Sequence, residues 1–226
     1  MDIIFSDCTV RFGARTALHP LSLRIEGRRV GVIGLNGSGK TTVARLINGL
    51  TLPSGGRVTV NGIDIATEPE RARLEAGFVF QNPQNQLIMP IVSEDIIFGL
   101  KARGTKNAEA EARMAATLRR FGIENLEKRR VYELSGGEMQ LAAMASVSAL
   151  SPRILILDEP TNQLDIKNRR LVLNAIDKMD EDAVVITHDL DFALRLPRLL
   201  LFHEGRLVAD GAPEETIAHY RKVAGC

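Results

Sequence analysis

A glycine-rich segment early in the chain has the residue types and the spacing of a phosphate-binding loop. Gly34–Thr42 reads GLNGSGKTT and fits the pattern G-x-x-x-x-G-K-[ST]. A short apolar run, Arg29–Ile33, precedes it, and a helix-like run, Thr42–Leu50, follows it. Glycines let backbone N–H groups wrap around a chain of phosphates, and the positive end of a helix dipole adds to the attraction. The sequence therefore predicts a nucleotide-binding site at this loop.

The loop also supplies two side chains with specific chemistry. Lys40 is expected to reach the β- and γ-phosphates, and the Thr41 hydroxyl is expected to bind Mg²⁺. A glycine-rich turn with a solvated lysine is the alternative, but it gives no reason for the strand before the loop and the helix after it. The residues expected to surround the phosphates are Asn36, Gly37, Ser38, Gly39, Lys40, Thr41 and Thr42.

Two carboxylates follow a buried strand in Ile154–Pro160, which reads ILILDEP. The end of a strand beside the phosphate loop is where Mg²⁺ needs a second contact, and Asp158 fits that place. Glu159, one residue further, is expected to orient or deprotonate a water molecule that attacks the γ-phosphate. Alone, two acids at a strand end are more often a helix cap or a solvated turn. Together with the glycine-rich loop they predict hydrolysis of a nucleoside triphosphate.

The segment LSGGE, Leu134–Glu138, opens a helical stretch and has two interpretations. Ser135 can cap that helix, while Gly136 and Gly137 let an anion approach its free N–H groups. Ser135 and Glu138 are also spaced S-x-x-E, which is the pattern of a capping box. The two interpretations are compatible. The sequence predicts a helix N-terminus here and leaves open whether it meets an anion.

The elements around these motifs indicate an α/β fold. Residues 3–12 and 21–25 alternate apolar and polar side chains, as half-buried antiparallel strands do. After Pro152 the chain has short apolar runs separated by helical segments, which is typical of a parallel sheet covered on both faces. These runs are 154–157, 183–187 and 198–202.

A middle section, residues 92–150, is rich in Ala, Glu, Arg, Met and Leu and predicts an all-helical insertion. Within it, apolar residues at helical spacing predict the buried face of one helix. We therefore expect a nucleotide-binding core with an antiparallel β subdomain over residues 1–80 and 151–226, and a helical subdomain carrying LSGGE over residues 81–150. The residues of the expected buried face are Ala110, Met114, Leu118 and Phe121.

Composition excludes several classes of protein. The chain has 226 residues and a net charge of +1, from 29 basic and 28 acidic side chains, so no strong field favours nucleic acid. Its two cysteines, Cys8 and Cys226, have neither metal-ligand spacing nor the density of a disulfide framework. The apolar runs are far shorter than the roughly 20 residues of a membrane span, and the first residues do not read as a secretory signal. We expect a cytoplasmic protein, unless a partner holds it at a membrane.

The order of the motifs resembles that of ABC-type ATPase subunits, and the likeness covers nearly the whole chain. It implies a phosphate-loop, RecA-like parallel-sheet core with an antiparallel β subdomain and an inserted helical subdomain. It also implies ATP and Mg²⁺ as ligands and the hydrolysis of ATP to ADP and phosphate. The residues that carry the resemblance are Gly34–Thr42, Gln81, Leu134–Glu138, Ile154–Glu159, TNQLD at Thr161–Asp165, and His188.

In that family two subunits pair head to tail around two ATP molecules. The resemblance implies that Ser135 and Gly137 of one subunit close on the γ-phosphate bound by the other subunit's loop. It places Asp165 at the dimer seam. The partner subunit is either a second copy of this chain or a related ATPase.

The resemblance assigns three further residues. His188, after the strand 183–187, is expected to touch the γ-phosphate, and Phe12 is expected to stack on adenine, although by itself Phe12 would read as a core residue. Gln81 is expected to join the Mg²⁺ site to the helical subdomain and to a transmembrane partner. By themselves His188 and Gln81 are ordinary polar residues.

Two segments, FQNPQNQ at 80–86 and SEDIIFGL at 93–100, resemble the energy-coupling-factor branch of bacterial uptake transporters. This likeness implies a transmembrane coupling protein and a small substrate-binding membrane protein as partners, and a peripheral place on the cytoplasmic face of the bacterial inner membrane. The chain ends soon after the helical segment Pro213–Val223, as in the compact ATPases of biotin transporters. Biotin is therefore the expected substrate, with cobalt, nickel or another vitamin as alternatives.

The chain departs from the family pattern at two positions. Glu138 stands where Gln is usual, and Leu141 stands where Arg is frequent. The first change affects contact with the neighbouring nucleotide, and the second removes a polar contact inside the helical subdomain.

A soluble ABC ATPase that acts on DNA, ribosomes or iron–sulfur assembly is the alternative class. A phosphate-loop kinase or GTPase is disfavoured, because no N-K-x-D guanine motif is present.

Overall fold

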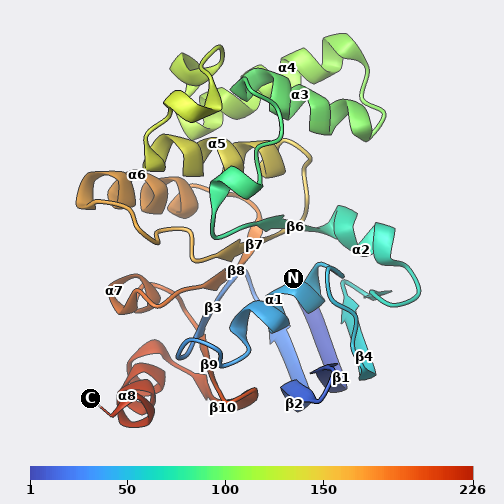
Figure 1. The fold of residues 1–226 in the computed structure, drawn as a ribbon, viewed down its shortest axis with the longest axis vertical. Coiled ribbons are helices and arrows are strands. Elements are labelled where there is room, and N and C mark those ends of the chain that lie inside the picture. Colours follow the sequence, from blue (N-terminus) through green and yellow to red (C-terminus); the bar gives the residue numbers. More distant parts are fainter. Residues whose placement is uncertain (226) are drawn as a thin grey trace. The chain divides into compact units, whose positions relative to one another are not determined.

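The computed structural model describes residues 1–225, which form two compact units. The first unit consists of Met1–Ala76, Arg153–Glu159 and residues 181–225. The second consists of Gly77–Pro152 and Pro160–Asp180. The chain leaves the first unit within β6 (Ala76–Val79) (Figure 1). Cys226, one of the two cysteines, lies outside the described residues.

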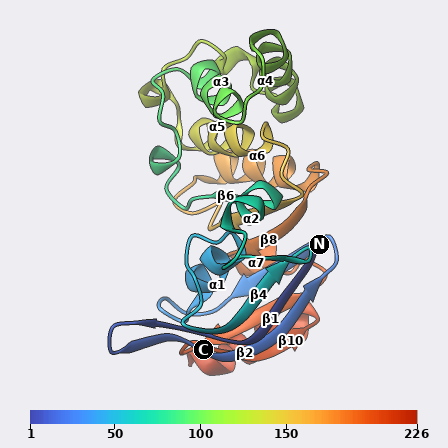
Figure 2. The same cartoon turned by 90° about the vertical axis from the view of Figure 1, so that its right-hand side faces the viewer.

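One sheet of the first unit is antiparallel, as the alternating pattern predicts. Its order is β2-β1-β4-β5, and Figure 2 shows β4, β1 and β2 side by side. Ile3 pairs with Ile25 and Phe5 with Leu23, so that the apolar members of each strand share the buried face. The strands are β1 (Asp2–Phe12), β2 (Arg15–Glu26), β4 (Gly55–Val60) and β5 (Ile63–Asp64).

The other sheet of the first unit has a parallel centre with one antiparallel edge. Its strands in this unit follow the order β10-β9-β3-β8-β7, and only β10 runs antiparallel to its neighbour. Nearly every residue of β3, β7, β8 and β9 is buried, which is why these strands read as continuous apolar runs. The strands are β3 (Arg29–Ile33), β7 (Ile154–Asp158), β8 (Asp182–Ile186), β9 (Leu199–His203) and β10 (Arg206–Gly211).

Four helices belong to the first unit. α1 begins where the phosphate loop ends and buries Val43, Leu46 and Ile47. Because α1 contacts β7 and β8, its N-terminus is held near the carboxyl ends of the central strands. The helices are α1 (Lys40–Ile47), α2 (Pro69–Glu75), α7 (Leu190–Ala193) and α8 (Pro213–Ala224).

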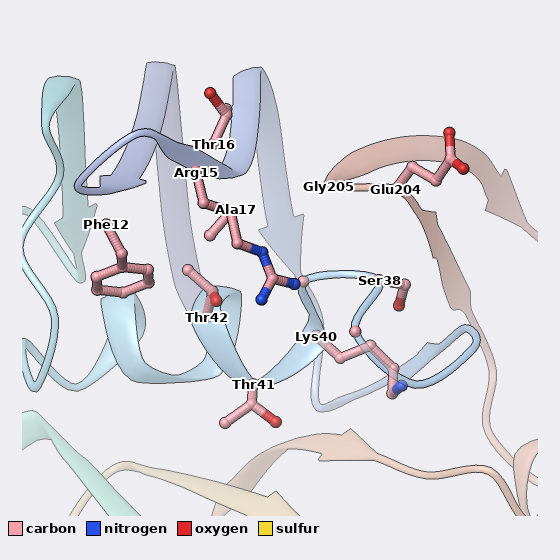
Figure 3. Close-up of a pocket in the computed structure, with 12 residues that line it drawn as sticks. Phe12, Arg15, Thr16, Ala17, Ser38, Lys40, Thr41, Thr42, Glu204 and Gly205 are labelled. Carbon is pink, nitrogen blue, oxygen red and sulfur yellow. The ribbon is translucent and has the colours of Figure 1, made fainter.

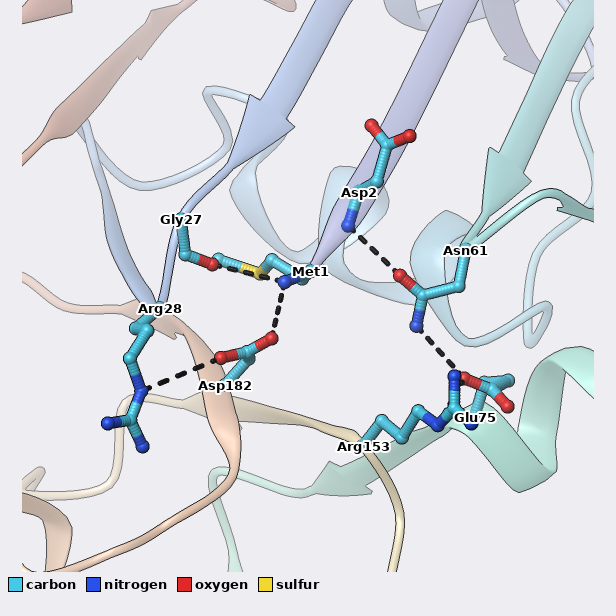
Figure 4. Close-up of polar contacts among 8 residues, drawn as sticks. All are labelled: Met1, Asp2, Gly27, Arg28, Asn61, Glu75, Arg153 and Asp182. Carbon is cyan, nitrogen blue, oxygen red and sulfur yellow. Dashed lines mark hydrogen bonds and ion pairs between the residues drawn. The ribbon is translucent and has the colours of Figure 1, made fainter.

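A chain of polar contacts ties the antiparallel sheet to the start of β7 (Figure 4). The Asn61 Oδ1 atom accepts from the Asp2 backbone N–H at 3.0 Å, and Asn61 Nδ2 donates to Glu75 Oε2 at 2.9 Å. Arg153, just before β7, lies 3.8 Å from the same Glu75 oxygen. These contacts fix β1 and the β4–β5 turn against the strand that carries Asp158.

The second unit is mainly helical, and α5 is its centre. In Figures 1 and 2, α5 lies between α6 and the pair formed by α3 and α4. The predicted apolar face of α4 is buried, which confirms the helical periodicity of that segment. Residues 160–180 also belong to this unit, because α6 packs on α5. The helices are α3 (Val92–Ala102), α4 (Asn107–Phe121), α5 (Gly136–Ser148) and α6 (Ile166–Asp177).

No helix within residues 1–225 combines the length and the apolar character that crossing a membrane requires.

Candidate nucleotide-binding site

A cavity of about 410 Å³ lies at the N-terminus of α1 in the first unit (Figure 3). Three segments line it: the β1–β2 hairpin, residues 37–42 of the phosphate loop, and the turn between β9 and β10. Phe12 lines the cavity with a side chain that is 57% exposed, so it is not a core residue. Asn36 is exposed but does not line the cavity. The structure thus brings Phe12 and six of the seven predicted loop residues together.

The shape of the loop depends on Gly34. Its φ of +151° places it in a region that favours glycine, and a Cβ atom there would lie 2.2 Å from the Phe202 carbonyl oxygen. The loop is also tied to the β9–β10 turn, because the Gly205 N–H donates to the Ser38 carbonyl at 3.0 Å. Position 34 therefore has no room for a side chain, and the loop backbone is fixed by the close approach of Gly34 to Phe202 and by the hydrogen bond at Ser38.

Lys40 lies folded into the loop that it follows. Its Nζ atom donates to the carbonyl oxygens of Gly34 at 2.8 Å and Leu35 at 3.0 Å, and the residue is 7% exposed. Burial lowers the pKa of Lys40, while the nearby carboxylates of Glu159 and Asp158 act in the opposite direction. The loop therefore encloses a cationic group.

The loop and the start of α1 carry hydrogen-bond donors that are suited to a ligand. The Ser38 hydroxyl is buried and makes no hydrogen bond, although it lines the cavity. The N-cap residue of α1, Gly39, makes no side-chain cap, and the first N–H groups of an α-helix have no acceptor within the helix itself. An anion with several oxygens, such as a polyphosphate, matches this set of donors.

Asp158 ends β7 with a buried and incompletely satisfied carboxylate. Its Oδ1 atom makes no hydrogen bond within the described residues, and the carboxylate receives a hydrogen bond from the Thr41 side chain. Burial raises the pKa of Asp158, the neighbouring Glu159 raises it further, and Thr41, Arg45 and Lys40 oppose the rise. A carboxylate with an open oxygen beside a hydroxyl is the hard-oxygen donor set that Mg²⁺ prefers. The residues present therefore fit this ion.

Glu159 and His188 meet at the carboxyl ends of the neighbouring strands β7 and β8. The Glu159 Oε2 atom lies 2.6 Å from His188 Nδ1 and also accepts the His188 backbone N–H at 3.2 Å. Glu159 has a φ of +53°, a left-handed conformation that is costly for a non-glycine residue, and its N–H donates to the Ile186 carbonyl at 2.9 Å. The strained backbone and the histidine together fix the direction of the carboxylate.

The remaining predicted residues, which are Gln81, Ser135, Gly136, Gly137 and Asp165, belong to the second unit. Ser135 caps α5 in a complete capping box with Glu138, so that interpretation of LSGGE is confirmed. A Cβ atom at Gly137 would lie 2.4 Å from Asn168 Oδ1, and Asp165 holds that side chain by accepting from Asn168 Nδ2 at 2.9 Å. Gly137 is therefore required for close packing of α5 on α6.

Gln81 lies in the stretch after β6 and is exposed. Within the second unit it lines a cavity of about 470 Å³, together with residues of α5 and of the segment 162–164. Leu141, at the position where the family frequently has Arg, is 5% exposed on the buried helix α5. It contributes to packing and not to a polar contact.

The segment between Gln81 and α3 is both core and surface. Leu87 is buried, whereas Ile88 is 74% exposed. Asp95, which is 4% exposed, accepts the backbone N–H groups of Ile88 at 2.7 Å and Met89 at 3.1 Å, and it accepts the Ser146 hydroxyl at 2.6 Å. A single buried carboxylate thus connects this segment to α5.

Sequence reasoning missed part of the cavity lining. The β1–β2 hairpin and the β9–β10 turn lie far apart in the chain and meet only through the fold. The one usable signal was the basic side chain of Arg15, three residues after Phe12. The residues that were missed are Arg15, Thr16, Ala17, Glu204 and Gly205.

Comparisons with known proteins agree with this geometry. Residues 18–162 match the family model described as ABC transporter. The biotin transport ATP-binding protein BioM of Rhizobium etli is 60% identical over 224 residues, covering 99% of this chain and 100% of that protein. The energy-coupling factor transporter ATP-binding protein EcfA1 of Symbiobacterium thermophilum is 38% identical over 216 residues, covering 92% of this chain and 75% of that protein.

Two solved structures share the fold. The first is cbiO1 from Clostridium perfringens, described as part of the ABC transporter complex cbiONQ, with a TM-score of 0.86 and 28% identity over 99% of this chain and 93% of that one. The second is the ATP-binding cassette MJ0796, a dimer in a post-hydrolysis state bound to ADP and Pi. It has a TM-score of 0.82 and 27% identity over 93% of this chain and 98% of that one.

Proposed function

This chain belongs to the ABC transporter family, and from that premise we propose that it is the ATP-hydrolysing subunit of a biotin importer of the energy-coupling-factor type. The observation that carries the ATPase is the constellation in the first unit, where Asp158, Glu159 and His188 stand at strand ends beside Lys40. The observation that favours biotin is the 60% identity to BioM over the whole of that relative.

In the proposed mechanism the phosphate loop binds ATP through the backbone N–H groups at the start of α1, the Ser38 hydroxyl and Lys40. The Lys40 ammonium exchanges its bonds to the loop carbonyls for bonds to the β- and γ-phosphates. Phe12, exposed at the rim of the same cavity, stacks on the adenine ring.

Asp158 and Thr41 are the residues of the first unit that would hold Mg²⁺, and Gln81 is proposed as a further ligand. Bound there, the ion would neutralise charge that develops on the phosphate oxygens. The open Oδ1 atom of Asp158 supports this assignment, because a buried carboxylate oxygen without a partner is costly unless a ligand completes it.

Glu159 orients and deprotonates the attacking water. Its carboxylate is held by both the ring and the backbone of His188, so its direction is set before the substrate arrives. The His188 side chain is 57% exposed, which leaves the ring able to contact the γ-phosphate. The histidine thus has a positioning role toward Glu159 and a contact role toward the substrate.

Hydrolysis in this proposal needs a second subunit, either another copy of the chain or a related ATPase. Ser135 and Gly137 of that subunit close on the γ-phosphate from the N-terminus of α5, and Asp165 lies at the seam. Capping leaves the N-terminal N–H groups of a helix only partly satisfied, which supports contact with an anion there. A transmembrane coupling protein and a small substrate-binding membrane protein complete the transporter at the cytoplasmic face of the inner membrane.

The test begins with affinity purification of the chain from detergent-solubilised membranes and identification of its partners by mass spectrometry. The recovered complex is then placed in vesicles, and ATP-dependent uptake is measured with labelled biotin, Co²⁺ and Ni²⁺. We expect uptake of biotin that Lys40→Ala abolishes and that Lys222→Ala, an exposed change in α8, leaves unaltered.

Two results would contradict the proposal in different ways. Uptake of Co²⁺ or Ni²⁺ without biotin would show that the substrate is wrong, while the assignment as a transport ATPase would stand. Recovery of soluble partners alone would remove the transport function and leave an ATPase of another class.

A further inference from the structure

Glu138 binds both hydrogen-bond donors of Ser135 with a single carboxylate oxygen. The Glu138 Oε2 atom accepts from the Ser135 backbone N–H at 2.9 Å and from the Ser135 hydroxyl at 2.9 Å. The Glu138 backbone N–H completes the capping box by donating to Ser135 Oγ at 3.4 Å. The hydroxyl proton of Ser135 is therefore committed to a negatively charged group of its own chain.

This commitment conflicts with the task that Ser135 has in the proposed function. To bind the γ-phosphate of ATP on another subunit, the Ser135 hydroxyl must donate its proton to a phosphate oxygen. The Ser135 hydroxyl already donates this proton to the Glu138 carboxylate. Because that acceptor is charged, the hydrogen bond is a strong one. The phosphate must displace the carboxylate before it can use the hydroxyl.

Charge adds to the conflict. The N-terminus of α5, a helix of 13 residues, attracts negative charge, and Glu138 in its first turn already supplies it. The hydrogen bonds from Ser135 lower the pKa of Glu138, aided by Arg129 and Lys167, so the carboxylate is ionised at neutral pH. A glutamine here would keep the length and one acceptor oxygen but would not repel a phosphate.

We propose that Glu138 is a positioning residue that restrains Ser135, so that its carboxylate competes with the γ-phosphate for the N-terminus of α5 and weakens ATP-driven pairing of two subunits. The inference rests on the proposed function, in which Ser135 closes on the nucleotide of a second subunit. It gives the chain a built-in restraint on pairing that a neutral residue at position 138 would lack.

The test measures the pairing directly on the full chain. Wild type, Glu138→Gln and the control Glu111→Gln are titrated with AMP-PNP and Mg²⁺, and the monomer–dimer equilibrium is followed by analytical ultracentrifugation. Glu111 is an exposed acid on α4 in the same unit, so its variant has the same change of charge away from Ser135. We expect Glu138→Gln to lower the AMP-PNP concentration at half-dimerisation by about fivefold, and Glu111→Gln to leave it unaltered.

A double-mutant cycle separates this restraint from a general effect on folding. If Glu138 acts through the hydroxyl, the gain from Glu138→Gln shrinks when Ser135 is replaced by Ala. Binding of a fluorescent ATP analogue to the monomer, measured at low protein concentration, stays unaltered in Glu138→Gln. Weaker capping of α5 lowers the melting temperature but cannot strengthen pairing, so the direction of the shift identifies the cause.

Three outcomes decide the inference. A lower half-dimerisation concentration for Glu138→Gln, with coupling to Ser135, supports it. An unaltered or higher concentration, with wild type still pairing, overturns the restraint and leaves the proposed ATPase intact. If both proteins bind the analogue yet neither pairs, two copies of this chain do not form the ATP-driven pair, which overturns the restraint on their pairing and leaves the proposed function with a related ATPase as the second subunit.

Discussion

The Nδ1 atom of His188 lies 2.6 Å from Oε2 of Glu159, although the two residues follow different parallel strands, Glu159 directly after β7 and His188 two residues after β8. The same oxygen accepts the His188 backbone N–H at 3.2 Å, so two atoms of one residue orient one carboxylate. Parallel pairing of β7 with β8 creates this contact, because it brings the two strand ends to the same edge of the sheet.

Replacing Glu159 by Gln tests this arrangement. We expect phosphate release to fall by at least about 10²-fold, because the side chain loses its ability to accept a proton from water. ATP binding should persist, since the loop and Asp158 are unaltered. Phosphate release and nucleotide affinity are measured on the same preparation. The control is Glu215→Gln, an exposed change in α8, and a wild-type rate in Glu159→Gln would show that another group is the base.

Asp158→Asn tests the metal assignment. The change removes the charge that Mg²⁺ needs, so we expect Mg²⁺-dependent ATP affinity to fall by about tenfold and EDTA to have little further effect. Burial raises the pKa of Asp158, so its ionised carboxylate is less stable in the folded chain than in the unfolded chain. At neutral pH the ionised carboxylate therefore lowers the free energy of unfolding. The melting temperature without nucleotide should therefore not fall. A fall in that temperature together with unaltered Mg²⁺ dependence would make Asp158 structural.

Arg15→Ala tests a residue that only the fold brings to the cavity. Arg15 is exposed and points toward the loop in Figure 3. A Cβ atom built at Gly37 would lie 3.9 Å from the Arg15 guanidinium. We expect a loss of about fivefold in ATP affinity, partly recovered by Arg15→Lys, as for a solvent-accessible charge pair. Arg11→Ala, on the same hairpin but outside the cavity, is the matched control for isothermal titration. Equal losses in both variants would indicate a general electrostatic effect.

Asp95→Ala tests the connection between α5 and the segment before α3. The change leaves two backbone N–H groups and the Ser146 hydroxyl without their acceptor, at a cost of about 3 kcal/mol in the free energy of unfolding. Glu94→Ala, the exposed neighbour on the same helix, should cost less than about 0.5 kcal/mol. Denaturant titrations measure both. Similar values for the two variants would show that water replaces the lost carboxylate.

The parts of the fold that the sequence predicted are those with strong local patterns. The alternation in β1, the apolar runs of β7 and β8, and the glycine-rich loop depend on periods and spacings of a few residues. β10, by contrast, was not predicted, because Arg206–Gly211 has no buried residue and no clear alternation. Its pairing with β9 comes from the turn at Glu204 and Gly205, and this turn also completes the cavity.

For the site, the sequence identified residues by type and spacing but not by their contacts. It assigned Glu159 and His188 separately, and their hydrogen bond depends on the parallel register of two strands 28 residues apart, from Asp158 to Ile186. Asp95 gave no signal at all, because its partners are backbone N–H groups and a serine that come together only when the helical unit folds. Such partners depend on tertiary structure and not on residue type.

The bonds of Lys40 to the carbonyl oxygens of Gly34 and Leu35 also bear on kinetics. The conformational entropy of the loop is lost when the chain folds and not when ATP arrives, because the ammonium holds the loop closed around itself. Association of ATP then needs only an exchange of hydrogen bonds by one side chain. ATP binding should appear as a single fast phase in stopped-flow records. The slow steps of turnover should be the association and dissociation of the two subunits.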